Sequence, residues 1–221
     1  MACSPAELDR RLALLEPTPT SMQKRHSDAC ERNKDPIAEV LTDYLDDGDA
    51  VWEIGCGTGQ HAVYFADTFP HADWYPTDRK GRLESMRARR RDANLPNLQE
   101  PQTFDLFDKS RPEGPTSVDV IVAVNVLHIA PWEATERLFV HAGSSLPDEG
   151  VLYVYGPFRY ESRPLEESNQ QFDRQLRARD PQMGLRVFEE IEEVAADHGF
   201  ELVEDRAMPA NNRSLIWRRA D

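Results

Sequence analysis

Cysteine and long apolar runs are scarce in this sequence. The three cysteines, at positions 3, 30 and 56, are too few and too scattered for a disulfide framework or a zinc site. The six histidines show no metal-ligand spacing. No apolar run approaches the roughly 18 residues needed to span a membrane, and the start lacks the basic and apolar regions of a signal peptide. We therefore expect a cytoplasmic protein with no metal and no membrane partner.

Lysine is also rare, since only four of the 26 basic residues are lysines, and the net charge is −14. Two explanations stay open: a halophilic source, for which acidic, lysine-poor surfaces are typical, and a GC-rich genome, which favours arginine. The acidic surplus argues against a nucleic-acid partner, because phosphate contacts need clustered basic side chains. The one basic run, Arg87–Arg91, lies among acids on a predicted helix and indicates a solvated helix face.

Strand and helix patterns alternate along most of the 221 residues. Strands are predicted over residues 50–54, 73–77, 102–106, 118–124 and 151–155, with a closing pair over 200–207 and 214–218. Helices are predicted from Asp35-Pro36, with Asp35 as N-cap, and over 60–68, 81–93, 132–145 and 186–198. This alternation predicts one doubly wound α/β domain, a mostly parallel sheet between two helix layers. We expect an extension or lid over 1–27, the domain over 28–221, and a polar connection over about 156–184.

A glycine loop, Gly55-Cys56-Gly57-Thr58-Gly59, follows the first buried strand. Glycines permit positive φ and let a ligand approach the backbone, and the next helix offers free N–H groups. The G-x-G-x-G spacing differs from the dinucleotide pattern G-x-G-x-x-G. Glu53, two residues before the loop, suits the ammonium group of a sulfonium cofactor. A nicotinamide cofactor remains the alternative.

Further cofactor candidates follow the next strands. Asp78 ends the second strand about 20 residues after the loop, where a ribose-binding acid belongs; a plain helix cap is the alternative. Asp105 and Leu106, after the third strand, are predicted to flank the adenine ring, with a surface role as the alternative for Asp105. Asn125 ends the fourth strand and is predicted to hold the methionine end.

The loop and the acid before it, Glu53–Gly59, closely match the first motif of class I methyltransferases, which the sequence therefore resembles. More specific blocks resemble the DUF938 family of methyltransferases, which includes the methyltransferase-like 26 proteins. These blocks are Glu31–Ile37, Gly57–Ala62, His128–Trp132, Tyr155–Phe158, Ser168-Asn169, Phe172-Asp173, Arg179–Pro181 and Met208–Asn212. The resemblance implies a Rossmann-like, three-layer fold of seven strands with the last antiparallel, and S-adenosylmethionine as the cofactor.

Two positions depart from the family pattern. Cys56 stands where the family often has a small residue, and Met183–Val187 stands where it often has Trp-Gly-x-Arg-Asp. The second departure falls in the region expected to contact the acceptor. The resemblance therefore indicates the reaction class more strongly than the substrate.

The methyl acceptor is expected beyond the carboxyl ends of the strands, where open α/β sheets bind ligands. Arg32 and Asn33 are predicted to precede the first helix and cover the cofactor. His128, His61 and Asp173 are candidate bases. Candidate acceptor contacts are Trp132, Tyr155, Tyr160, Asn169, Phe172, Asn211 and Asn212. Three alternatives stay open: turn geometry for Asn211-Asn212, helix packing for Trp132, and a helical ion pair for Asp173.

The predicted function is methyl transfer from S-adenosylmethionine to a small-molecule heteroatom nucleophile, with a preference for a thiol. No N-P-P-Y-type motif is present, which argues against methylation of an adenine amino group. A protein methyltransferase, a catalytically inactive scaffold that binds the cofactor, and a nicotinamide-dependent oxidoreductase are the alternatives. The sequence gives no prediction of the oligomeric state.

Overall fold

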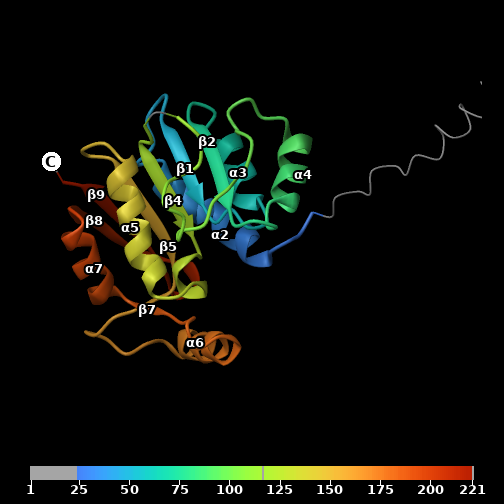
Figure 1. Cartoon of the computed structure of the whole chain (residues 1–221). Coiled ribbons are helices and arrows are strands. Elements are labelled where there is room, and N and C mark those ends of the chain that lie inside the picture. Colours follow the sequence, from blue (N-terminus) through green and yellow to red (C-terminus); the bar gives the residue numbers. More distant parts are fainter. Residues whose placement is uncertain (1–23, 116, 221) are drawn as a thin grey trace, which may run out of the picture.

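A seven-stranded sheet forms the centre of the protein in a computed structural model that describes residues 24–115 and 117–220 (Figure 1). The strand order is β3-β2-β1-β4-β5-β9-β8. β9 runs antiparallel to both of its neighbours, β5 and β8, and the other strand pairs are parallel. The strands are β1 (Ala50–Ile54), β2 (Asp73–Asp78), β3 (Gln102–Thr103), β4 (Val120–Val124), β5 (Val151–Gly156), β8 (Phe200–Met208) and β9 (Asn212–Arg219). The predicted doubly wound, mostly parallel seven-stranded sheet is confirmed, although β3 ends before the predicted residue 106.

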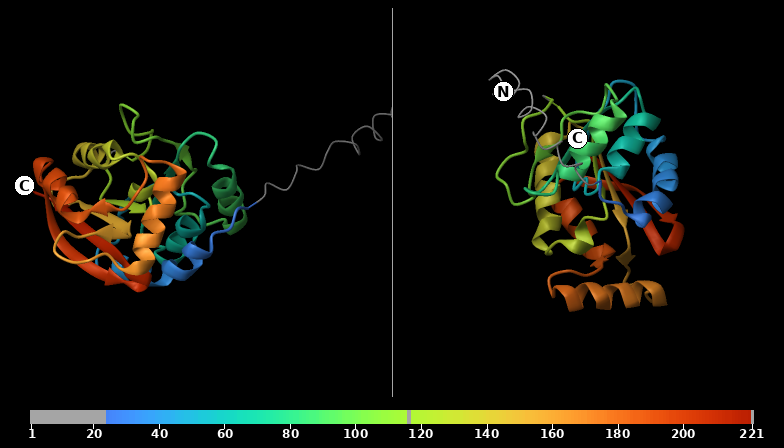
Figure 2. Two further views of the ribbon diagram at one scale, coloured as in Figure 1. Left: turned by 90° about the horizontal axis from the view of Figure 1, so that it is seen from below. Right: turned by 90° about the vertical axis from the view of Figure 1, so that its right-hand side faces the viewer.

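Helices cover both faces of this sheet (Figure 2). One face packs against α2 (Asp28–Leu41), α3 (Gln60–Thr68) and α4 (Glu84–Ala93), and the other against α5 (Glu133–Ser145) and α7 (Phe188–Asp197). Successive strand residues point to opposite faces, so Val51 lies in the first core and Trp52 in the second. No helix among the described residues has the length and apolarity to cross a membrane.

The first helix begins earlier than predicted. Ser27, rather than Asp35, is the N-cap of α2, and its Oγ accepts a hydrogen bond from the Cys30 N–H at 3.4 Å. Pro36 lies inside the helix, where it removes one backbone donor. The buried face of α2 anchors the helix despite this loss, through Ile37, Ala38, Val40 and Leu41. Of the predicted N-terminal extension, residues 1–23 lie outside the described residues.

The region predicted as a polar connection contains regular structure. β6 (Phe158–Arg159) pairs in parallel with β7 (Arg186–Val187), and α6 (Glu167–Arg179) lies between them in the sequence. In Figures 1 and 2, α6 lies apart from the helix layers, below the sheet. Only Asn169 and Leu176 of α6 are buried. The helix therefore lacks the apolar stripe by which a sequence pattern is recognised.

Candidate functional site

The three loop glycines all have left-handed backbone conformations, with φ of 77°, 57° and 81° for Gly55, Gly57 and Gly59. A Cβ on Gly55 would lie 2.8 Å from Val126 Cγ2, and one on Gly59 would lie 2.5 Å from Met86 Sδ. A Cβ on Gly57 would meet nothing closer than 3.8 Å. Gly55 and Gly59 thus permit close packing of neighbouring elements, whereas Gly57 leaves its backbone open to a ligand.

The end of β2 holds this loop in place. The Thr77 carbonyl oxygen accepts hydrogen bonds from the N–H groups of Gly55 and Cys56, both at 2.9 Å. One carboxylate oxygen of Asp78 accepts from the Gly57 N–H at 2.8 Å, and the other accepts from the Arg79 N–H at 2.7 Å. Asp78 therefore braces the loop at Gly57, and its ribose contact stays a prediction.

Glu53 is the acid beneath the loop, and only 2% of it is exposed. Its Oε2 accepts a hydrogen bond from Trp74 Nε1 at 2.7 Å. Burial, with a smaller contribution from the charge of Asp78, raises the pKa of Glu53 to about 7. Within the described residues no cation forms an ion pair with it. A buried carboxylate without a counter-charge is costly, so this site suits a ligand that brings a positive charge.

Asn125 and His128 meet at the carboxyl end of β5. Asn125 has a left-handed φ of 58°, and its N–H donates to the Tyr155 carbonyl oxygen at 2.8 Å. A Cβ on Gly156 would lie 3.4 Å from His128 Nδ1 and 3.8 Å from Asn125 Oδ1. Both polar side chains therefore lie beside Gly156 at the end of this strand.

His128 is a buried, uncharged histidine. Burial first, and then the positive charge of Arg186, lowers its pKa to about 4. The buried Arg186 is held by carbonyl oxygens, with Nε donating to Leu127 at 3.0 Å and Nη2 donating to Ala130. The Phe172 ring, from α6, lies edge-on to the His128 ring at a centroid distance of 5.5 Å. His128 and Phe172, both predicted from the sequence, are therefore neighbours.

A second buried cluster joins α2, α3 and β5 through Asn33. Its Oδ1 lies 2.7 Å from His61 Nε2, and its side chain also forms a hydrogen bond with the Tyr155 hydroxyl. Burial lowers the pKa of His61 to about 4, so the neutral ring donates from Nε2 to Asn33. Asn33 lies inside α2 rather than before it, as does Arg32, which is exposed. That part of the sequence prediction was wrong, because the helix begins at Asp28.

Asp173 has two partners in the described part of the chain. Its Oδ1 accepts a hydrogen bond from the Leu185 N–H at 2.7 Å, and its Oδ2 pairs with Arg177 Nε at 3.0 Å. The helical ion-pair alternative describes this residue better. Trp132 lies at the N-cap of α5 and packs against the core, as its structural alternative predicted.

The two residues predicted near the adenine ring follow β3 directly. Asp105 Oδ1 accepts from the Phe107 N–H at 3.1 Å, which forms a side-chain turn. Leu106 is buried, and its carbonyl oxygen lies 3.0 Å from His141 Nε2. The Phe107 side chain is 49% exposed. The two predicted adenine contacts, Asp105 and Leu106, thus directly precede the exposed ring of Phe107.

The remaining candidates gather around α6 and the β8–β9 turn. Tyr160, Asn211 and Asn212 line a pocket of about 200 Å³ there. The Asn169 side chain donates to the Asn211 carbonyl oxygen at 3.0 Å. Asn211 has a left-handed φ of 58°, and Asn212 donates to the Pro209 carbonyl oxygen at 3.0 Å. Asn211 and Asn212 therefore form the turn and also line the pocket.

Two residues that sequence reasoning did not select contact the glycine loop. Arg25 donates from Nη2 to the carbonyl oxygens of Gly57, at 3.0 Å, and Arg82, at 2.9 Å. Gln60 accepts from the Ser27 N–H at 2.7 Å and bonds to Glu31. Gln60 stood inside a block that resembled the family, so a signal was present. Arg25 fell in the predicted extension, where no spacing pointed to it.

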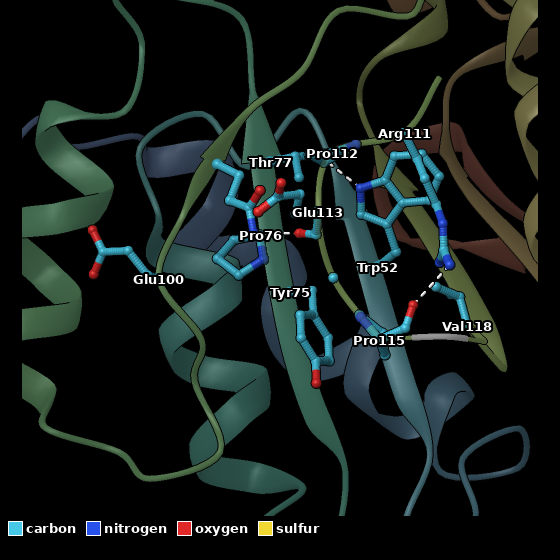
Figure 3. A pocket seen from close by; sticks show the side chains of 12 residues that line it. Trp52, Tyr75, Pro76, Thr77, Glu100, Arg111, Pro112, Glu113, Pro115 and Val118 are labelled. Carbon is cyan, nitrogen blue, oxygen red and sulfur yellow. Dashed lines mark hydrogen bonds between the residues drawn. The ribbon is translucent and has the colours of Figure 1, made fainter. Parts of the chain in front are cut away.

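Another pocket lies on the sheet itself (Figure 3). It is smaller, about 20 Å³, and lies between β1, β2 and the segment over residues 111–115. Trp52 Nε1 donates to Thr77 Oγ1 at 2.9 Å on its wall, and Glu100 and Glu113 lie around it. None of its lining residues is a predicted site residue. This pocket is therefore separate from the candidate site.

The profile of a family described as "Protein of unknown function (DUF938)" matches residues 24–219. Similar solved structures include an O-methyltransferase family protein from Burkholderia thailandensis (17% identity, 88% of this chain and 58% of that chain, TM-score 0.72). Another is the mitomycin 7-O-methyltransferase MmcR (20% identity, 86% of this chain and 54% of that chain, TM-score 0.71). A third is human N-acetylserotonin methyltransferase in complex with SAM (15% identity, 88% of this chain and 53% of that chain, TM-score 0.70). The chain thus spans little more than half the length of these proteins, and the likeness establishes a shared fold.

Proposed function

The chain belongs to the DUF938 family, and we propose that it transfers a methyl group from S-adenosylmethionine to a small-molecule heteroatom nucleophile, preferably a thiol. The observation that carries this proposal is Glu53, a buried acid in β1 just before the glycine loop, without a cationic partner in the described residues. The folds shared with methyltransferases support the same reaction class. Within the family, a relationship to the methyltransferase-like 26 proteins remains our prediction.

In this proposal, residues at the carboxyl edge of the sheet bind the groups of the donor. Glu53 suits the ammonium group of the donor, and the Gly57 backbone permits the donor to approach closely. The Asp78 carboxylate suits the ribose hydroxyls. Asp105 and Leu106 flank the adenine position. The bound donor supplies a methyl group activated by a sulfonium. S-adenosylhomocysteine is the expected product.

The acceptor end consists of Asn125, His128 and Phe172 in this proposal. Methyl transfer is a direct displacement, so alignment of the two reactants supplies much of the rate. A neutral imidazole whose pKa is about 4 accepts hydrogen bonds but is a weak base near neutral pH. Such a site favours acceptors that ionise readily, and a thiol does so more readily than an alcohol. His61 is less suited to this task, because its Nε2 is engaged by Asn33.

Two alternatives within the methyltransferase fold predict different behaviour. A protein methyltransferase needs an open cleft for a peptide, whereas here the Phe172 ring of α6 packs edge-on against the buried His128. An inactive scaffold would bind the donor without turnover. The neutral His128 beside Asn125 supports turnover. Transfer to a protein, or donor binding without any transfer, distinguishes these alternatives from our proposal.

An acceptor screen with donor labelled in the methyl group tests the proposal. Thiols, amines, phenols and carboxylates are compared, and we expect incorporation into a thiol to be fastest. His128→Gln should lower the rate, whereas His71→Gln, at an exposed histidine outside the site, should not. Labelling of protein substrates alone, or no labelling of any small acceptor, would contradict the proposed function.

A further inference from the structure

A polar pocket lies between the start of α6 and the β8–β9 turn, and the predicted donor residues do not line it. It has a volume of about 200 Å³. Its walls come from four parts of the chain and include Phe158, Tyr160, Arg163, Asn211, Asn212 and Arg213. We call this cavity the α6 pocket. Two arginines in one small cavity are notable in a chain whose net charge is −14.

Arg163 is an exposed residue at the α6 pocket, and its side chain packs on an aromatic ring. Its guanidinium carbon lies 3.8 Å from the centre of the Tyr160 ring, and the two backbones pair as an isolated β-bridge. The Tyr160 ring stacks on Phe188 at 5.0 Å and its hydroxyl donates to Asp205 at 2.9 Å. Stacking on a fixed ring reduces the entropy that Arg163 loses when it binds a ligand.

The charge of Arg163 is available, whereas that of Arg213 is neutralised. Arg213 Nε pairs with Asp205 Oδ1 at 2.6 Å. Arg163 forms no ion pair with any described residue. Glu166 also lines the pocket and opposes the binding of highly charged anions. A guanidinium that forms no ion pair matches the planar geometry of a carboxylate, which carries a single negative charge.

The α6 pocket adjoins the acceptor end of the candidate site. Phe158, on its wall, lies two residues after Gly156. The His128 ring lies beside Gly156, and it contacts the ring of Phe172 on α6. Asn211, also on the wall, bonds to Asn169 one turn before Phe172 on α6. Arg213, also on the wall, pairs with Gly156 in the sheet, so the pocket lies at the same end of β5 as His128.

We propose that the α6 pocket binds a carboxylate of the methyl acceptor through Arg163, so that the acceptor is a small monoanionic molecule that carries both a nucleophilic heteroatom and a carboxylate. This assignment rests on the proposed methyltransferase function, because it names the substrate class of that site. Arg163 acts in it as a specificity-determining residue.

Matched acids and amides test this assignment by calorimetric titration. The pairs are 3-mercaptopropionate with its amide, 4-hydroxybenzoate with its amide, and 2-mercaptobenzoate with its amide, each with and without S-adenosylhomocysteine. A charged hydrogen bond predicts that at least one acid binds about tenfold more tightly than its amide. Arg163→Gln should abolish this difference, and Arg174→Gln, at an exposed arginine of α6, should leave it unchanged.

Equal affinity of every acid and amide for the unaltered protein would overturn the assignment. Retention of the acid preference in Arg163→Gln would overturn it as well. These failures differ from failure of the proposed function, which would appear as no binding of S-adenosylhomocysteine. Circular dichroism of the two variants, compared with the unaltered protein, confirms that both are folded.

Discussion

Replacement of Glu53 by glutamine should stabilise the folded protein at alkaline pH while weakening donor binding. Burial raises the pKa of Glu53 from 4.5 to about 7. Because the pKa is raised on folding, the stability that Glu53 contributes is complete below the unfolded pKa and is lost as the pH rises through about 7. At about 1.4 kcal/mol per pKa unit, ionisation of Glu53 costs the folded state about 3 kcal/mol. Glutamine keeps an acceptor for Trp74 and avoids this cost.

Urea denaturation of both proteins between about pH 5 and about pH 8 measures this effect, since the other carboxyl groups are common to both and cancel. The stability of Glu53→Gln relative to the unaltered protein should increase by about 2 to 3 kcal/mol across this range. An unchanged difference would refute the reasoning. Donor affinity should fall by about 10- to 100-fold in the same variant, because a charged hydrogen bond contributes roughly 1.5–3 kcal/mol.

Four further predictions concern the loop, the buried polar cluster, the acceptor end and the surface. Gly57→Ala should lose only about 1–2 kcal/mol of stability but most of its affinity for S-adenosylhomocysteine. Gly59→Ala should unfold at a much lower urea concentration, because its added Cβ would collide with Met86 of α4. A larger loss of stability in Gly57→Ala than in Gly59→Ala would contradict the assignment of Gly57. Asn33→Ala should cost about 1–3 kcal/mol in urea denaturation, since it leaves two buried partners unpaired; no loss would argue against the cluster. The pH–rate profile should show no inflection near pH 6.5 from His128, whose pKa is about 4, and an inflection there that His128→Gln removes would be contrary evidence. If the source is halophilic, molar KCl should raise the urea midpoint, whereas an unchanged midpoint favours the GC-rich explanation.

The first half of the sheet could be predicted from the sequence because local signals agreed with the tertiary structure. β1 and α3 begin and end at the predicted residues. An apolar run forms β1, and the glycines after it separate β1 from α3. The positions of Glu53, Gly57 and Asp78 followed from this arrangement. Parallel strands place their carboxyl ends at one edge, so residues distant in the sequence converge there.

The errors arose where tertiary contacts replaced local signals. Asp35-Pro36 carries a strong helix-start pattern, yet the buried face of α2 and the Ser27 cap extend the helix past it. α6 buries almost no apolar surface, so its sequence resembles a polar loop. Asp173 pairs with Arg177, its i+4 neighbour on α6, which the sequence offered as an alternative, whereas its hydrogen bond from the Leu185 N–H exists only in the folded chain.

Calorimetric titration with S-adenosylhomocysteine and with NAD tests the central claim most directly, namely that the loop over Gly55–Gly59 binds a sulfonium cofactor. We expect that S-adenosylhomocysteine binds the unaltered protein, that NAD does not, and that Glu53→Gln weakens the binding of S-adenosylhomocysteine by about 10- to 100-fold. Binding of NAD alone, or equal binding of S-adenosylhomocysteine by both proteins, would contradict it.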